Sequence, residues 1–138
     1  MDHARKRDKG CRFPLCSCKK KGYRVEVAHL IHRGMGGDKS GERTEPDILV
    51  TVCYPRHQGV VSLHSGAIRP RALTKKGMDG PIAWEIEGPW FLTYSGNLER
   101  RDEYRGLWVE IARESAVGVW EPFTEAQRFV LKALAKEL

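Results

Sequence analysis

Residues 25–64 read VEVAHLIHRGMGGDKSGERTEPDILVTVCYPRHQGVVSLH, and the expected fold is built around the two apolar runs of this segment. It opens with an alternating apolar run over 25–30, which predicts a strand that carries His29 at its end. Glycines between 34 and 37 then exclude a helix and begin a polar loop. The stretch therefore starts as a short strand that leads into a long connection.

The second half of the same stretch supplies the partner strand. An apolar run over 48–52 predicts the strand that pairs with the first, and it leads into Cys53 and His57 at the start of a helix. We expect this pairing to bring His29 and His57 close together. Two imidazoles held close can bind one divalent metal ion, so the stretch predicts a metal-binding hairpin.

Length and charge set the wider frame. A chain of 138 residues, 41% apolar and 30% charged, predicts one domain with a modest core. No run approaches the ~20 apolar residues of a membrane span, and the start lacks a signal-peptide core, so we expect a cytoplasmic protein without a membrane partner. Residues 1–76 hold 17 Lys and Arg against 7 Asp and Glu, whereas residues 77–138 hold 7 against 11. The basic front half favours a polyanion such as DNA, and a merely solubilising tail is the alternative.

The cysteines point to a metal site. In a protein without a secretion signal disulfides are disfavoured, and a cluster of this kind is more typical of bound metal. A tetrahedral zinc site with four thiolates would tie the first three cysteines to the fourth. A single residue between two of them is tight spacing, so a three-cysteine site completed by histidine or water, and no metal at all, are the alternatives. The four residues are Cys11, Cys16, Cys18 and Cys53.

These features together resemble the HNH family of metal-dependent nucleases. The shared pattern is the strand-end His29, the Gly36-Gly37 loop, the run DILVTVC and Cys53-x3-His57, within about residues 11–64. The following run, LHSGAIRPRALTKKGMDGPIAWEI, resembles an extension found in some phage and prophage HNH proteins. The resemblance implies an α+β protein with a zinc-braced ββα-metal (HNH) core, a small antiparallel β extension and a C-terminal helix.

The resemblance also implies an activity, which is hydrolysis of phosphodiester bonds in DNA. His29 matches the general base that activates water, a task that suits an imidazole with its ordinary pKa of about 6.5. His57 matches a ligand of the active-site ion, which is Mg²⁺, Mn²⁺, Zn²⁺ or Ni²⁺ in such sites. The family's second ligand directly precedes the base, where this chain has Ala28. His64 is the first candidate to replace it, and His32 is the second.

Another departure concerns the Asn that gives the family its middle letter. Ile48 stands in its place, with Asp47 one residue before. Asp47 could supply a carboxylate to the ion or brace the loop, and it could also be a turn residue. Arg33, beside the glycines, could hold a phosphate in bidentate fashion or lie in solvent. These departures keep a second function open, a zinc-containing DNA-binding protein on an HNH scaffold that does not cleave.

Further cations are candidates for contacts with the DNA backbone. They lie between the cysteines and the first strand, and at the start of the helix after the second strand, where an arginine replaces the family's last cysteine. Each of them could equally be a solvated surface residue. The candidates are Lys19, Lys20, Lys21, Arg24 and Arg56.

The remaining organisation is predicted more coarsely. Residues 1–10 are expected to be a basic flexible arm, 11–66 the nuclease core, and 67–138 a β-rich extension with a terminal helix in the same compact domain. Strands are expected over 67–73, 82–87, 90–94 and 107–115, with a loop over 98–106. Thr124-x-x-Gln127 predicts a capping box, and the apolar face of the helix after it, including 126, 130 and 133, should dock on the protein or on a second subunit, so a homodimer stays open.

Overall fold

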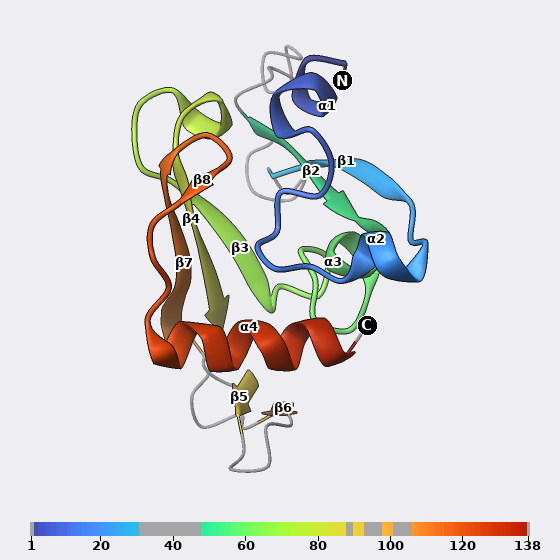
Figure 1. Cartoon of the computed structure of the whole chain (residues 1–138), viewed down its shortest axis with the longest axis vertical. Helices are drawn as coiled ribbons and strands as arrows, with labels where there is room; N and C mark the ends of the chain where they lie inside the picture. Colours follow the sequence, from blue (N-terminus) through green and yellow to red (C-terminus); the bar gives the residue numbers. More distant parts are fainter. Residues whose placement is uncertain (1, 31–47, 88–89, 93–97, 101–105, 138) are drawn as a thin grey trace.

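The computed structural model describes residues 2–30, 48–87, 90–92, 98–100 and 106–137. Figure 1 shows how the helices and strands of these residues are arranged. In chain order they are α1 (Asp2–Asp8), α2 (Cys18–Lys21), β1 (Val25–His29), β2 (Leu49–Cys53), α3 (Tyr54–Gln58), β3 (Ile68–Ala72), the 3-10 turn η3 (Gly77–Asp79), β4 (Ile82–Glu87), β5 (Trp90–Leu92), β6 (Leu98–Arg100), β7 (Trp108–Ala116), β8 (Val119–Trp120) and α4 (Glu125–Glu137).

The predicted hairpin and the helix that follows it are confirmed. Strands β1 and β2 pair antiparallel, with Val25 opposite Cys53 and His29 opposite Leu49. All five residues of β2 are buried, which fits its uninterrupted apolar sequence. Helix α3 begins directly after β2, with Pro55 in its first turn, where a missing N–H costs nothing. The hairpin therefore delivers α3 to the end of β1 at which Val25 lies.

The β extension is a separate four-stranded antiparallel sheet in the order β3-β4-β7-β8. Strand β4 is buried along almost its whole length, and Ile82, Trp84 and Ile86 alternate toward the core. Strand β7 has a shift in register opposite Trp84, so its neighbouring residues Ile111 and Ala112 are both buried. The loop expected over 98–106 is wrong in part, because β6 pairs with β5.

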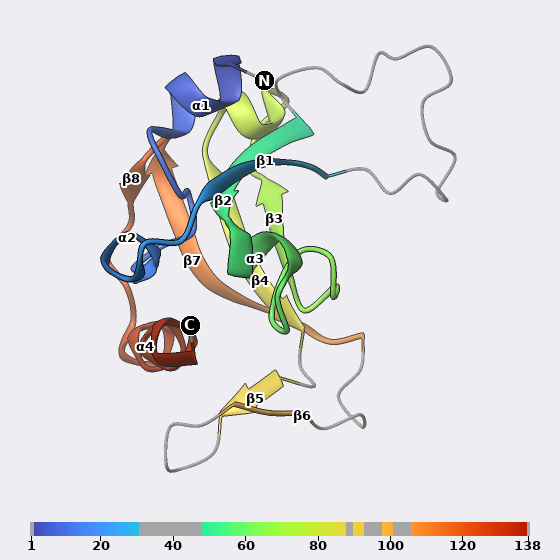
Figure 2. The same cartoon turned by 90° about the vertical axis from the view of Figure 1, so that its right-hand side faces the viewer.

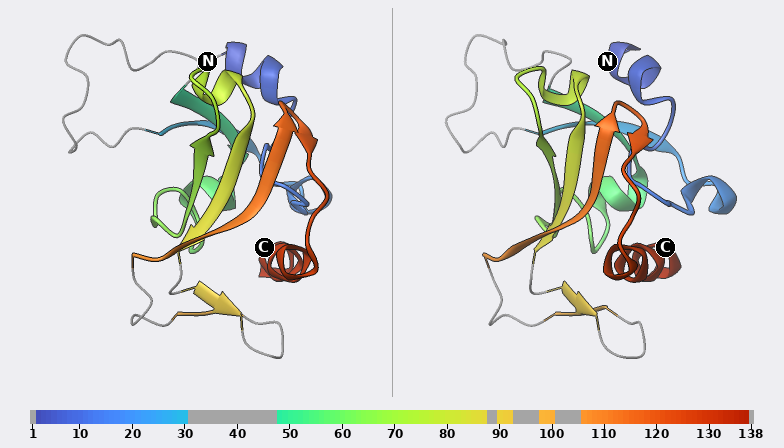
Figure 3. Two further views of the ribbon diagram at one scale, coloured as in Figure 1. Left: turned by 90° about the vertical axis from the view of Figure 1, so that its left-hand side faces the viewer. Right: turned by 60° about the vertical axis from the view of Figure 1, so that its left-hand side comes forward.

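One hydrophobic core joins the hairpin, the sheet and α4. Trp84 packs edge to face on Phe13, with ring centroids 5.0 Å apart, and Val50 and Val52 of β2 belong to the same buried cluster as Leu134 of α4. The hairpin lies in front of the sheet in Figure 2, and the sheet lies in front of the hairpin in the left-hand view of Figure 3. The front and rear parts of the chain are therefore two layers over a shared core.

A buried ion pair reinforces the joint between these layers. The Arg12 guanidinium donates to both carboxylate oxygens of Glu114, at 3.1 and 2.7 Å, and to the carbonyl oxygens of Met78 and Gly80. Glu114 also accepts the backbone N–H of Ile82. Burial of these charges is tolerated because nearly every donor and acceptor has a partner. The sequence analysis did not anticipate this pair.

The expected flexible arm over residues 1–10 is wrong, because residues 2–8 form helix α1 and pack on β2. Asp8 accepts the backbone N–H of Thr51 at 2.8 Å and its side chain is fully buried, while Arg7 donates to the carbonyl oxygen of Leu49. Ala4 is also fully buried. The polar sequence conceals this contact, because it is made mainly by charged side chains that bond to the backbone of β2.

Helix α4 begins as its sequence predicts. The Thr124 hydroxyl accepts the N–H of Gln127 at 3.1 Å, and the Gln127 side chain accepts the N–H of Thr124 at 3.0 Å, which is a reciprocal capping box. The buried face differs from the expected one, because Leu131 is buried and Ala126 is exposed. Among the described residues no helix is long and apolar enough to cross a membrane.

Candidate functional site

The four cysteines form one cluster. Their sulfur atoms all lie within 4.8 Å of one another, and the Sγ atoms of Cys16 and Cys53 are 3.7 Å apart. Four sulfurs around a zinc ion at ~2.3 Å would be separated by roughly 3.8 Å in a tetrahedron. Soft thiolate ligands in this arrangement suit zinc. The cluster therefore fits a structural zinc ion, and its ligands come from both the N-terminal loop and the end of β2.

The backbone holds the cysteine loop against the hairpin. Arg12 donates its N–H to the carbonyl oxygen of Thr51 at 2.9 Å, and Cys53 donates its N–H to the sulfur of Cys11 at 3.3 Å. Cys18 opens the short helix α2, which ends at Gly22 in the left-handed region with a φ of 72°. The chain can thus reverse within a few residues and return as β1 beside the cluster.

The protonation of the cluster shows why it suits a cation. Hydrogen bonds from Cys11 and Cys53 lower the pKa of Cys16 to about 2. The pKa of Cys11 is raised by its hydrogen bond to Cys16, and that of Cys53 is raised to about 12, since the Cys16 thiolate and burial outweigh the lowering effect of Cys11. One thiolate is therefore stable by itself, whereas a divalent ion would stabilise several.

A second polar cluster lies between β1 and α3. The Nδ1 atom of His57 is 2.7 Å from a carboxylate oxygen of Glu26, and Gln58 donates to the same oxygen at 3.2 Å. The ring of His64 meets that of His57 edge to face, with centroids 5.0 Å apart. The hydrogen bond from His57 lowers the pKa of Glu26, as does the bond from Arg24. Glu26 is therefore a carboxylate that fixes the orientation of the His57 ring.

His64 reaches this cluster from outside helix α3. The helix ends at Gln58, and His64 lies in the loop beyond it. The N–H of His64 donates to the carbonyl oxygen of His57 at 3.0 Å, which folds the loop back onto the helix. The two predicted ligands are brought together all the same.

His29 lies at the other end of β1. It is exposed and sits opposite Leu49, three residues along the strand from Glu26, a separation of roughly 10 Å at the rise of a β-strand. No side-chain hydrogen bond, ion pair or ring contact joins it to another described residue. The expected closeness of His29 and His57 is therefore wrong: His57 bonds Glu26 from α3, and His29 lies further along β1, on the face of the strand opposite to that of Glu26.

Three of the predicted site residues fall outside the described part of the chain. His32, Arg33 and Asp47 all belong to residues 31–47, which connect the two hairpin strands. The roles expected for them stay predictions. Among the residues that the structure describes, only the four cysteines bring three or more metal-ligand atoms within 4.8 Å of one another. The histidine cluster thus offers two imidazoles and a carboxylate, but their possible ligand atoms do not lie as close together as the four sulfurs do.

The expected phosphate contact at Arg56 is wrong, because the side chain is buried with a relative exposure of 1%. It donates to the carbonyl oxygen of Val61 at 2.8 Å and to that of Leu134 at 2.7 Å. Its guanidinium also lies over the ring of Phe13, 5.4 Å from the centroid. Arg56 therefore ties α3 to α4.

The other predicted cations remain accessible. Lys19, Lys20 and Lys21 are exposed on α2, and the side chain of Arg24 is 71% exposed although it bonds Glu26 at 2.8 Å. Arg24 also lies over the ring of Tyr54, 4.7 Å from its centroid. These residues form a cationic edge beside the cysteine cluster.

The sequence analysis missed Glu26 as a site residue. The alternation of the strand was the available signal, because it places Glu26 on the face of β1 opposite to that of Val25, Val27 and His29. No family model, curated protein or solved structure matches the chain.

Proposed function

We propose that this chain is a metal-dependent endonuclease that hydrolyses phosphodiester bonds in DNA on a zinc-braced ββα hairpin. The observation that carries the proposal is the oriented histidine cluster: Glu26 fixes His57, and His64 packs against it, at the junction of β1 and α3. The resemblance of residues 11–64 to HNH nucleases supports the same conclusion. The basic front half of the chain supplies attraction for DNA.

The cluster is arranged as a ligand pair would be. Because the carboxylate of Glu26 engages Nδ1 of His57, the Nε2 atom is left to face an ion, an arrangement common for metal-bound histidines. His64 would supply the second nitrogen. Water or phosphate oxygens would complete the coordination, together with any ligand from residues 31–47. A divalent ion bound there would stabilise the negative charge that develops on the phosphate oxygens.

His29 would act as the general base. Its side chain is exposed on the hairpin, so a water molecule and a phosphate can reach it. Neutral imidazole would accept a proton from that water as the oxygen attacks phosphorus.

The zinc site would serve the hairpin and take no part in the reaction. It ties residues 11–18 to Cys53, the last residue of β2 and the residue from which α3 starts. The direction of α3, and with it the position of His57, depends on this anchor.

Incubation of the purified protein with supercoiled plasmid and Mg²⁺ or Mn²⁺ tests the proposal. We expect nicked or linear products with the parent, and a loss of at least about 100-fold in rate with His29→Ala, as for removal of a general base. His3→Ala is the matched control, since the His3 side chain bonds Asp79 and contacts neither His29 nor the histidine cluster, and it should cleave normally. Equal cleavage by His29→Ala and the parent would refute the assigned base.

A DNA-binding zinc protein without cleavage is the second candidate. Ala28 stands in the place of a metal ligand, and the described residues of the histidine cluster do not gather three ligand atoms closely. Plasmid binding in a gel-shift assay, without nicking under any of the four metals Mg²⁺, Mn²⁺, Zn²⁺ and Ni²⁺, would favour this function over the nuclease.

A further inference from the structure

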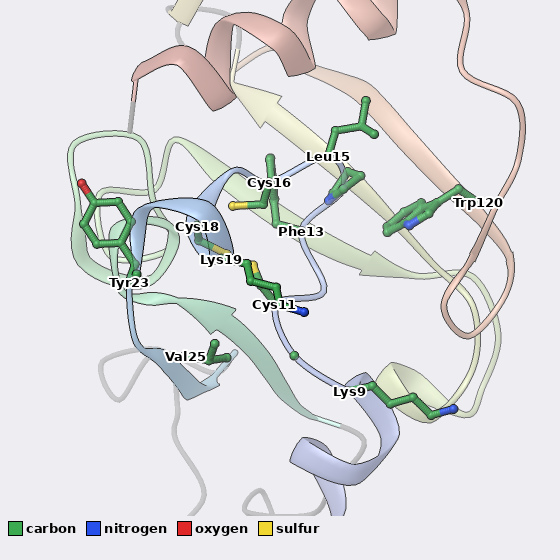
Figure 4. Close-up of a pocket in the computed structure, with 13 residues that line it drawn as sticks. Lys9, Cys11, Phe13, Leu15, Cys16, Cys18, Lys19, Tyr23, Val25 and Trp120 are labelled. Carbon is green, nitrogen blue, oxygen red and sulfur yellow. The ribbon is translucent and has the colours of Figure 1, made fainter.

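A hollow of about 690 Å³ opens beside the cysteine cluster, on the face of β1 opposite to Glu26 and its partner His57. Figure 4 shows Tyr23 and Trp120 on opposite sides of it, with the cysteines between them. Leu15 and Phe13 form its apolar part. A volume of this size is typical of small-ligand sites in proteins.

The backbone around the hollow is strained. Among the described residues other than glycine, Lys9 and Leu15 alone have a positive φ, at 54° and 51°, and both line this hollow. Leu15 follows Pro14 in a turn, where a positive φ ordinarily calls for glycine. Its side chain is nevertheless 53% exposed, so burial in the fold does not offset the strain. Strain of this kind is concentrated at functional sites.

The chemistry of the lining selects a class of ligand. Aromatic rings and an exposed leucine suit a flat, weakly polar group, and among the described residues no acidic side chain lines the hollow. Lys9 and Lys19 belong to the lining, and Lys20 and Lys21 continue the positive charge along α2. A zinc ion bound by four thiolates would carry a formal charge of −2. The four lysines carry more positive charge than this, so the surroundings of the hollow would remain positive. A base attached to a phosphate matches both the flat apolar part and the cationic edge.

We propose that this hollow binds one unpaired nucleotide, with the base against Tyr23, Leu15 and Trp120 and the phosphate at Lys19. This inference rests on the proposed function and narrows its substrate to DNA with a single-stranded part. Val25 lines the hollow, and the next residue, Glu26, faces His57 across the strand. A single strand anchored in the hollow would therefore cross β1 to reach the histidine cluster.

Fluorescence anisotropy in buffer without added divalent metal tests the site apart from cleavage. The probes are a labelled 15-nucleotide oligo(dT), the same sequence as a blunt duplex, and free dTMP as competitor. We expect the single strand to bind at least about tenfold more tightly than the duplex. Competition by dTMP at millimolar concentration would identify the nucleotide unit as sufficient, whereas its failure beside tight oligo(dT) binding would show that a strand is needed.

Two pairs of variants locate the binding. Leu15→Gly should weaken oligo(dT) binding about tenfold without lowering the melting temperature, because glycine relieves the positive φ. Leu107→Gly removes another exposed leucine outside the hollow and should bind normally. Lys19→Glu should weaken binding, and Lys75→Glu on the β3–β4 connection should weaken it much less.

The outcomes separate this site from the nuclease. Equal affinity for single strand and duplex, or unchanged binding by both Leu15→Gly and Lys19→Glu, would overturn the nucleotide site even if plasmid is cleaved. Binding of an acidic peptide but of no oligonucleotide would overturn it as well. Tight oligo(dT) binding sensitive to both variants, without cleavage, would support the hollow and refute only the nuclease.

Discussion

The cysteine cluster and the histidine cluster both adjoin the β1–β2 hairpin, but only the cysteine cluster brings a full set of ligand atoms together. The four sulfurs already stand within 4.8 Å of one another, and backbone hydrogen bonds hold their loop to β2. The histidines have one fixed partner, Glu26, and the long connection over 31–47 lies next to them in sequence. The cysteine cluster therefore has a complete set of ligand atoms in the fold itself, whereas the described residues of the histidine cluster have not.

The largest difference between the two clusters should appear when one cysteine is removed. Cys16→Ser takes away the thiolate that its neighbours stabilise, and we expect loss of zinc and a large drop in melting temperature, since structural zinc contributes on the order of 10 kcal/mol in small metal-bound domains. His57→Ala should keep its zinc and melt close to the parent. Calorimetry with elemental analysis checks both variants. A stable, zinc-loaded Cys16→Ser protein would show that the cluster is not the brace.

Breaking the buried ion pair between Arg12 and Glu114 should weaken the contact between the N-terminal cysteine segment and the four-stranded sheet. Glu114→Gln leaves the Arg12 guanidinium buried beside a neutral amide, and we expect a loss of about 3–5 kcal/mol in the free energy of unfolding. Glu110→Gln removes a carboxylate from the exposed pairs with Arg71 and Arg113 and should cost about 0–1 kcal/mol. Urea unfolding measures both. Similar losses in the two variants would contradict the role given to the buried pair.

Glu26→Gln should damage the histidine cluster and spare the cysteine cluster. Loss of the carboxylate frees the His57 ring, and we expect plasmid cleavage to fall about 10- to 100-fold while the zinc content is unchanged. The measurement is the cleavage rate as a function of Mn²⁺ concentration. We expect the rate of the variant to depend more strongly on the Mn²⁺ concentration than the rate of the parent. A variant with the parent's rate at every metal concentration would separate Glu26 from the reaction.

The smallest effect concerns pH. Because His57 lowers the pKa of Glu26 below its ordinary 4.5, the carboxylate stabilises the fold above that value, and the contribution is lost as the pH falls through the lowered pKa. The group is partly exposed, so the contribution should stay below about 1 kcal/mol. The difference in unfolding free energy between the parent and Glu26→Gln should therefore shrink from pH 6 to pH 3. A difference that grows toward low pH would reverse the assigned sign.

Local patterns predicted the elements that make up the hairpin and the sheet. The apolar alternation of 25–29, the continuous run of β2 and the capping box at Thr124 each depend on neighbours in sequence. Cysteine count and compartment predicted the metal cluster, although the one-residue gap between Cys16 and Cys18 suggested crowding. The turn at 14–15 and the start of α2 at Cys18 relieve that crowding, so all four sulfurs converge.

Long-range contacts of charged residues escaped the sequence analysis. Arg56 was expected to contact the DNA backbone or lie in solvent, and no role was predicted for Arg12. In the fold the guanidinium of Arg56 donates to carbonyl oxygens, and that of Arg12 donates to Glu114 and to carbonyl oxygens distant in sequence. Residues 1–10 read as an arm for the same reason. For Glu26 the sequence offered only its place in the alternation of the strand, which does not reveal that His57 is its partner. Such partners are set by the packing of layers, which no local pattern records.

X-ray absorption at the zinc edge of the purified protein reports directly whether the four cysteines hold a zinc ion. We expect one zinc ion per chain with four sulfur neighbours at about 2.3 Å, unchanged in His57→Ala. Nitrogen or oxygen neighbours that disappear in His57→Ala, or a folded protein that contains no zinc, would contradict it.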